Sequence, residues 1–134
     1  MTEGKGKSVL LVEDNPANME LATDLLEMAG WRVAQATTAE VALDLAARER
    51  WDLILMDVSL PGIDGLEATR RLKQDPRTAG IPVAALTAQA MPGDREAAMS
   101  AGCVGYIAKP IDTRRFAQTV AAFLGQEGAG LAST

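Results

Sequence analysis

Histidine is absent from this chain of 134 residues, and its absence removes the commonest general base and a frequent metal ligand. No phosphohistidine can form on the chain itself. Whatever chemistry the chain performs must therefore rely on carboxylates, hydroxyls and lysine.

A single cysteine, Cys103, leaves no partner for a disulfide within the chain. The polar start MTEGKGKS contains no apolar segment of the signal-peptide type, and no apolar run approaches the roughly 20 residues that span a bilayer. We therefore expect a cytoplasmic protein that does not enter a membrane. Cys103 follows a glycine and precedes a short apolar run, which favours a small buried side chain over a reactive thiol.

Positive charge and aromatic residues are also scarce. The formal net charge is −5, aromatic residues make up 4% of the chain, and no stripe of Lys and Arg with interleaved aromatics is present. Direct nucleic-acid binding is therefore not expected. Hydrophobic residues (48%) and charged residues (23%) are near globular averages, and the length suits one domain.

Short apolar runs alternate with longer segments of helical period along the chain. Helices are expected to start near Pro16, Thr38, Asp64, Pro92 and Asp112, where proline, threonine or aspartate can open or cap a first turn. Gly30 and Gly102 fall where the first and fourth helices should end. The expected strands are SVLLV (8–12), WRVAQA (31–36), DLILM (52–56), PVAAL (82–86) and VGYIA (104–108).

This alternation predicts an α/β fold with five βα units. Strands that are almost wholly apolar indicate a parallel sheet covered on both faces, and right-handed crossovers favour the doubly wound, flavodoxin-like strand order 2-1-3-4-5. We expect an N-terminal extension over residues 1–7, the domain over 8–124 and a flexible, Gly-rich C-terminal tail over 125–134.

In open parallel sheets the functional crevice lies beyond the carboxyl ends of the strands. Glu13 and Asp14 follow the first predicted strand, Asp57 the third, Thr87 the fourth and Lys109 the fifth. Carboxylates placed this closely repel one another unless a hard divalent cation such as Mg²⁺ compensates them. With the metal, Lys109 and Thr87 around it, a phosphoryl group would be compensated on several sides, and Asp57 could act as its nucleophilic acceptor.

These residues lie in four motifs that resemble the response-regulator receiver family over residues 8 to 124. The motifs are VEDN at 12–15, DLILMDVSLPGIDGLE at 52–67, LTA at 86–88 and KP at 109–110. The VEDN and MPGD (91–94) stretches resemble stand-alone regulators of the DivK type in particular. The resemblance implies a phosphoacceptor protein of two-component signalling or a phosphorelay, which catalyses only its own phosphorylation and dephosphorylation and is not otherwise an enzyme.

The resemblance also implies a role for each site residue. Asp14 would bind Mg²⁺ directly, Glu13 mainly through water, Asp57 as ligand and phosphoacceptor, and Ser59 through its backbone carbonyl. Lys109 would pair with the phosphoryl group. The residues implied in switching and access are the hydroxyl of Thr87, the ring of Tyr106, the small Ala88 that keeps the pocket open, and Pro110, whose peptide bond with Lys109 would be cis.

The implied partners are a sensor histidine kinase or a histidine phosphotransfer protein as donor, and a target protein docking on the fourth helix, fifth strand and fifth helix. Because no further domain follows in this sequence, we expect output by protein contact. Two alternatives stay open: a receiver fragment of a hybrid sensor kinase and a non-phosphorylated interaction module. An aspartyl phosphohydrolase is disfavoured, because such an enzyme needs a second acid near its nucleophile, and Val58 and Ser59 follow Asp57 instead. A flavodoxin-like electron carrier is disfavoured, because its first loop should be rich in Ser, Thr and Gly, whereas here it is Glu-Asp-Asn-Pro.

Overall fold

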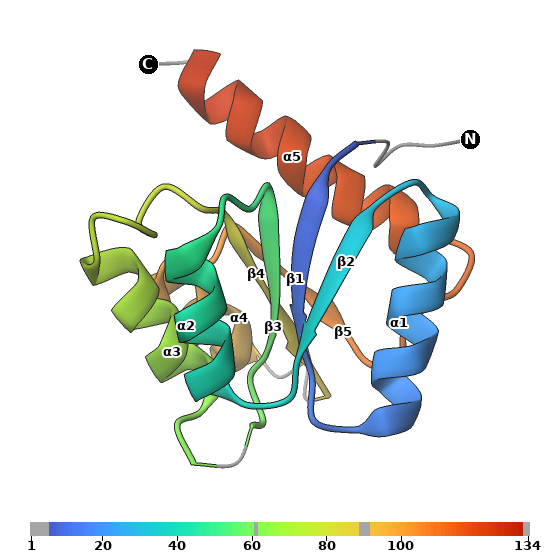
Figure 1. The fold of residues 1–134 in the computed structure, drawn as a ribbon, viewed down its shortest axis with the longest axis horizontal. Coiled ribbons are helices and arrows are strands. Elements are labelled where there is room, and N and C mark those ends of the chain that lie inside the picture. The colour runs from blue at the N-terminus through green and yellow to red at the C-terminus, as the bar shows by residue number, and fades with distance from the viewer. Residues whose placement is uncertain (1–5, 61, 89–91, 133–134) are drawn as a thin grey trace.

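Five parallel strands form one sheet at the centre of the molecule, in the order β2-β1-β3-β4-β5 (Figure 1). The computed structural model describes residues 6–60, 62–88 and 92–132. Most of the N-terminal extension and residue 91 of the MPGD stretch lie outside these ranges. The order is the one expected from the sequence, and the strands are β1 Ser8–Val12, β2 Arg32–Ala36, β3 Leu53–Asp57, β4 Val83–Thr87 and β5 Gly105–Ala108.

Side-chain caps begin three of the helices where the sequence places them. The side chains of Asn15, Thr38 and Asp64 each accept a hydrogen bond from the backbone N–H three residues further on. Gly30 and Gly102 follow α1 and α4 with φ angles of 98° and 110°, a backbone region that glycine enters without strain. The helices are α1 Pro16–Met28, α2 Ala39–Arg48, α3 Gly65–Gln74, α4 Pro92–Ala101 and α5 Phe116–Ala132.

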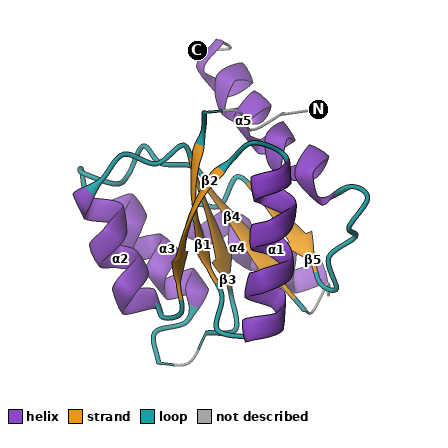
Figure 2. Cartoon of the chain, turned by 45° about the vertical axis from the view of Figure 1, so that its right-hand side comes forward, coloured by secondary structure: helices purple, strands orange, loops and turns teal. Residues whose placement is uncertain are grey.

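The helices cover both faces of the sheet, as an apolar parallel sheet requires (Figures 1 and 2). Helices α2, α3 and α4 pack on one face, where the first buried cluster includes Leu10, Ile54 and Met56. Helices α1 and α5 pack on the other, where the second cluster includes Leu11, Leu55 and Phe116. Alternate residues of β1 and β3 thus contribute to opposite cores. Every residue of β3 and β4 is buried, as is every residue of β1 except Ser8.

The fifth helix differs from the expected bounds at both ends. A turn precedes it, in which the Asp112 side chain accepts a hydrogen bond from the N–H of Arg114, and the helix starts at Phe116 rather than near Asp112. At the other end the backbone stays helical to Ala132, past residue 124. Helix propensity does not explain this extension, because three of the eight residues from 125 to 132 are glycines, which disfavour a helix.

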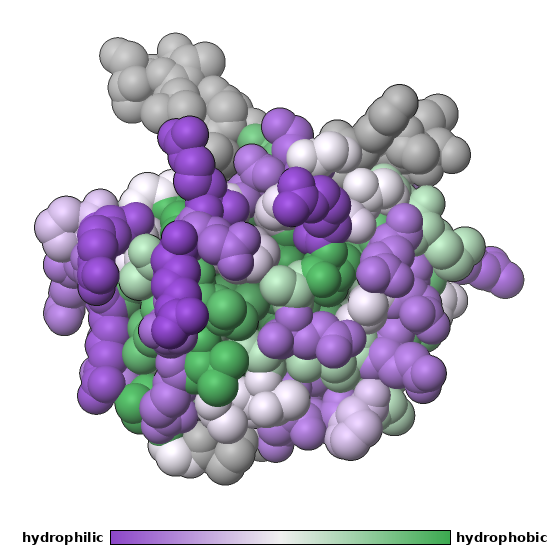
Figure 3. Space-filling view, viewed as in Figure 1, coloured by the Kyte–Doolittle hydropathy of each residue, from purple (hydrophilic) through white to green (hydrophobic). Residues whose placement is uncertain are grey.

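On the side of the molecule seen in Figure 1, where α2 and α1 lie on either side of β2, hydrophilic and hydrophobic side chains occupy separate zones. Figure 3 shows hydrophilic residues along the outer sides of the helices and hydrophobic residues between them. Within the described ranges, no helix is both long enough and apolar enough to cross a membrane.

Candidate functional site

Three acidic residues meet at the carboxyl ends of β1 and β3. Glu13 and Asp14 follow the last residue of β1, and Asp57 is the last residue of β3. One carboxylate oxygen from each lies within 4.8 Å of the others. Glu13 and Asp57 are buried, whereas Asp14 is exposed, so the cluster is open to solvent on one side.

Lys109 lies between the two buried carboxylates. Its Nζ is 2.6 Å from Oε1 of Glu13 and 2.9 Å from Oδ2 of Asp57. The lysine reaches the site from the end of β5, where its backbone N–H donates to the carbonyl of Thr87 over 2.7 Å. The Lys109–Pro110 peptide bond is cis. One ammonium group thus compensates two carboxylates that would otherwise repel each other.

Burial and pairing change the proton affinity of this cluster. Burial raises the pKa of Glu13 above its usual value, and its hydrogen bond with Lys109 offsets part of that rise. For Lys109, burial alone would lower the pKa, but the hydrogen bonds to Glu13 and Asp57 outweigh it, so that the pKa is raised. The lysine therefore stays cationic at neutral pH and holds the acids together.

The backbone around Asp57 fixes the position of its carboxylate. Oδ1 accepts a hydrogen bond from the N–H of Ser59 over 2.9 Å, which leaves Oδ2 to Lys109. The N–H of Val58 donates to the carbonyl of Leu86, so the loop after β3 begins against β4. Gly65, the first residue of α3, lies so close that an added Cβ would be 2.1 Å from the Asp57 carbonyl oxygen.

A small cavity of about 70 Å³ lies beside the acidic cluster, between β4, β5 and α4. Thr87, the last residue of β4, lines it together with Ser59 and Tyr106. Three of the other lining residues, Ala85, Ala97 and Ala98, have small side chains. Thr87 is buried and Tyr106 is half-buried, and both side chains therefore border the same internal space.

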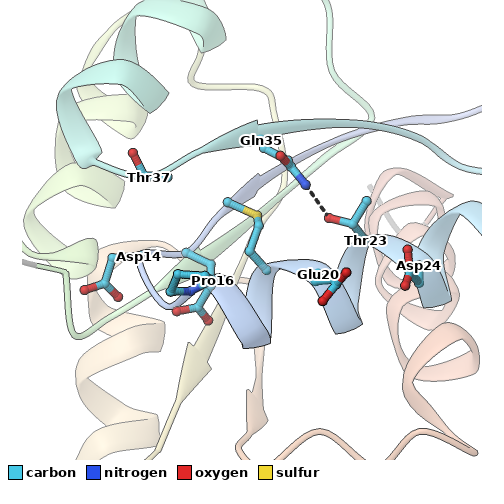
Figure 4. Close-up of a pocket in the computed structure, with 9 residues that line it drawn as sticks. Asp14, Pro16, Glu20, Thr23, Asp24, Gln35 and Thr37 are labelled. Carbon is cyan, nitrogen blue, oxygen red and sulfur yellow. Dashed lines mark hydrogen bonds between the residues drawn. The ribbon is translucent and has the colours of Figure 1, made fainter.

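A larger and more open cavity of about 380 Å³ lies on the other side of the cluster, between α1 and β2. Figure 4 shows Glu20 and Asp24 on α1 facing this space, with Asp14 at the end nearest the site. At the opposite side the Gln35 amide donates to the hydroxyl of Thr23 over 2.9 Å. The approach to the acidic cluster from α1 is therefore itself acidic.

Most residues named from the sequence meet at this edge. Glu13, Asp14, Asp57 and Lys109 form the charged cluster, and the lining of the adjoining cavity contains Thr87, Ser59 and Tyr106. Ala88 is exposed directly after Thr87. Sequence reasoning missed Gly65, although a glycine directly after the capping Asp64 was a signal that the chain passes something closely there.

Comparison with known proteins places this geometry in a family. The family profile described as "Response regulator receiver domain" matches residues 9–121. The polar-differentiation response regulator DivK of Brucella anthropi is 49% identical over 119 residues, which cover 89% of this chain and 97% of that protein. DivK of Brucella abortus is 48% identical over the same length.

Solved receiver structures have the same fold. The receiver domain of a sensor histidine kinase from Pseudomonas aeruginosa, solved with a magnesium ion coordinated in its active site cleft, has a TM-score of 0.82 and 38% identity, and the match covers 90% of this chain and 98% of that one. A response regulator from Chloroflexus aurantiacus has a TM-score of 0.85 and 33% identity, covering 90% and 99% of the two chains.

Proposed function

This chain belongs to the response regulator receiver family of two-component signalling, and from that premise we propose that Asp57 accepts a phosphoryl group. The observation that carries the proposal is the position of the Asp57 carboxylate. It is 2% exposed, lies at the carboxyl edge of the sheet, contacts Lys109 and stands within the acidic cluster of Glu13 and Asp14. A carboxylate so placed can act as a nucleophile.

Mg²⁺ is the metal that these residues fit. The donor set is three carboxylates, the oxygen ligands that a hard divalent cation prefers, and the exposed side of the cluster leaves room for retained waters. In the proposal Asp14 and Asp57 bind the metal directly, Glu13 mainly through water, and Ser59 through its backbone carbonyl. The bound ion would supply positive charge for the incoming phosphoryl oxygens.

The reaction is a transfer of one phosphoryl group. An Asp57 oxygen forms the new bond to phosphorus while the bond from phosphorus to the donor atom breaks, and the donor leaves with that electron pair. Lys109, already 2.9 Å from Asp57, pairs with a phosphoryl oxygen, and the hydroxyl of Thr87 donates to another. The exposed position of Ala88 leaves the entrance open.

Thr87 and Tyr106 form the proposed switch. The cavity of about 70 Å³ that they both line is smaller than the roughly 150 Å³ space that holds a benzene ring in an engineered protein core. The Tyr106 ring can therefore enter only when Thr87 moves toward the phosphoryl group and gives up its share of the volume. Phosphorylation at one edge then changes the outer surface of α4, β5 and α5.

The phosphoryl donor in this proposal is a phosphohistidine on a sensor histidine kinase or a histidine phosphotransfer protein, since this chain has no histidine. The downstream partner is a protein that docks on the α4, β5 and α5 face, with no direct contact to nucleic acid. The exchange takes place in the cytoplasm. Similarity to DivK, which is matched over 97% of its own length, supports output through protein contact.

The test is phosphorylation of the purified chain by acetyl phosphate, with and without Mg²⁺, measured by intact mass. We expect a gain of one phosphoryl group that requires Mg²⁺ and is lost in Asp57→Ala. Asp44→Ala, on the exposed side of α2, is the matched control and should be phosphorylated normally. No gain in the parent chain, or a gain that survives in Asp57→Ala, would overturn the proposal in favour of a non-phosphorylated interaction module.

A further inference from the structure

Tyr106 lies between two spaces of different size. On its inner side is the cavity of about 70 Å³ beside Thr87. On its outer side is an open groove of about 200 Å³, lined by Arg95, Met99, Val104, Gly105, Tyr106 and Phe123. The ring is half-exposed and borders both spaces. The contacts of the ring therefore decide which of the two spaces it occupies.

Arg95 makes such a contact. Its guanidinium carbon lies 6.0 Å from the centroid of the Tyr106 ring, over the ring face, on the side of the outer groove. A cation over an aromatic face is attracted by the negative charge of the π-system. The next residue toward the helix start, Asp94, lines the inner cavity, so that consecutive residues of α4 stand on the two sides of the ring.

We propose that Arg95 is a latch that holds the Tyr106 ring outward in the unphosphorylated protein. The inference rests on the proposed switching of Tyr106 and adds a contact that controls the position of the ring before phosphorylation. When the ring enters the cavity between Ala85, Ala97 and Ala98, it leaves the guanidinium, and the cation–π contact is lost. The contact therefore opposes inward movement and lowers the fraction of active-like molecules before phosphorylation.

The expected size of this bias follows from the exposure of the pair. Arg95 is exposed, and a cation–π contact at an exposed site is worth about 0.5–1 kcal/mol, which corresponds to a change of about two- to fivefold in an equilibrium constant. A bias of this size keeps the switch poised, because a phosphoryl group that is bound more tightly by the inward state can still reverse it. Arg95 acts through Tyr106 and is a positioning residue.

The chain offers a clean probe, because Tyr106 is its single tyrosine. Incorporation of 3-fluorotyrosine gives one fluorine resonance, which reports the ring environment. The comparison is between the parent chain, Arg95→Ala, Arg95→Lys and Glu96→Ala, each at rest and saturated with Mg²⁺ and beryllofluoride, a mimic of the phosphoryl group. Glu96 is an exposed neighbour on α4 and serves as the matched control.

In resting Arg95→Ala we expect the resonance to move part of the way toward its beryllofluoride position. Arg95→Lys should lie between Arg95→Ala and the parent, because an ammonium is also attracted to the ring face, and Glu96→Ala should match the parent. Since removal of a charge near the ring can itself shift the resonance, the second measurement is beryllofluoride affinity. It should rise about two- to fivefold in Arg95→Ala, as expected for a shifted equilibrium.

Two results would overturn the latch, and they differ in what they leave standing. If beryllofluoride moves the resonance in all variants but affinity and resting position are the same in Arg95→Ala and the parent, the latch is wrong and the Tyr106 switch stands. If Asp57 is phosphorylated by acetyl phosphate but beryllofluoride moves the resonance in no variant, Tyr106 is not a switch and the latch fails with it.

Discussion

At the scale of single residues, Lys109 is the group on which the metal-free site depends. Glu13 and Asp57 are 1% and 2% exposed, and both hydrogen-bond to the Lys109 ammonium. Loss of one partner of a buried charged group leaves the other uncompensated. Because Asp14 keeps the cluster open to water, we expect a smaller penalty than for a sealed ion pair.

Lys109→Met should lower the free energy of unfolding by about 1–3 kcal/mol in the absence of Mg²⁺, measured by urea titration. Mg²⁺ should restore part of the loss, because a bound cation compensates the same carboxylates. Lys7→Met, which removes an exposed lysine at the opposite end of β1, is the control and should change stability by less than about 0.5 kcal/mol. A deficit that Mg²⁺ leaves untouched would contradict this account of the site.

The contact between Glu13 and Lys109 also predicts how the free energy of unfolding depends on pH. The folded pKa of Glu13 is raised above 4.5, so the stability linked to its protonated form is present below pH 4.5 and is lost as pH rises through the folded pKa. Lys109→Met removes the hydrogen bond that lowers this pKa, so the folded pKa should rise further. The free energy of unfolding that Lys109→Met loses relative to the parent chain should therefore be largest near pH 7 and should shrink toward pH 4.5. Urea titrations across this range would test it, and a deficit independent of pH would contradict it.

At the scale of elements, the start of α3 positions the end of β3. Gly65 begins α3, and a Cβ there would lie 2.1 Å from the carbonyl oxygen of Asp57, a distance that real side chains do not reach. The side chain of Asp64 caps the first turn of α3 by accepting a hydrogen bond from the N–H of Glu67. This cap opposes a shift of the first turn away from Asp57. The start of α3, the loop before it and Asp57 are therefore one packed unit.

Gly65→Ala should destabilise the protein by about 1–3 kcal/mol, as overpacking does, and should slow phosphorylation of Asp57 by acetyl phosphate because the β3–α3 loop must shift. Gly80→Ala is the matched control: an added Cβ there meets nothing within 4 Å, and the change should be neutral or stabilising by about 0.4–1 kcal/mol. Thermal unfolding and intact mass measure the two effects. Equal behaviour of the two variants would show that the close approach at Gly65 is without consequence.

The helices and strands also show which parts of the fold and the site could be predicted from the sequence. The capped starts of α1, α2 and α3 and the apolar strands could be predicted, because their determinants are local. The start of α5 could not, because Asp112 forms a turn of its own before the helix, and a capping aspartate looks the same in both settings. In the site, strand order brought the acids together, whereas the bridging position of Lys109 and the close approach of Gly65 depend on packing between distant segments.

At the scale of the whole molecule, the site joins two cores that a single sheet separates. Val12 belongs to the cluster under α2, α3 and α4, and Leu11 to the cluster under α1 and α5, and β1 delivers Glu13 directly after both. A ligand held by residues at the carboxyl ends of β1 and β3 therefore stabilises strands that both cores share. Binding at the edge should consequently be felt in global stability rather than only in the surrounding loops.

Cys103 offers a way to measure this coupling. Its thiol is buried in the cluster beneath α3 and α4, and burial raises its pKa above 9.0. The stability linked to the protonated thiol is therefore present below pH 9.0 and is lost only as pH rises through the folded pKa. At pH 7 to 8 the thiol of the folded chain is both shielded and protonated, so reaction with a disulfide reagent requires the cluster to open.

We expect Cys103 in the folded chain to react with the reagent orders of magnitude more slowly than Cys103 in the urea-unfolded chain. Mg²⁺ should lower this rate further, by the same factor by which it lowers the unfolding equilibrium constant. In Asp57→Ala the slowing by Mg²⁺ should be weaker, because one of the proposed ligands of the metal is missing. The rate is read from the absorbance of the released thiolate. If Mg²⁺ stabilises the chain in urea titrations but leaves the labelling rate unchanged, Cys103 becomes accessible by local opening of α3 or α4, and the metal edge and this cluster are not coupled as one cooperative unit.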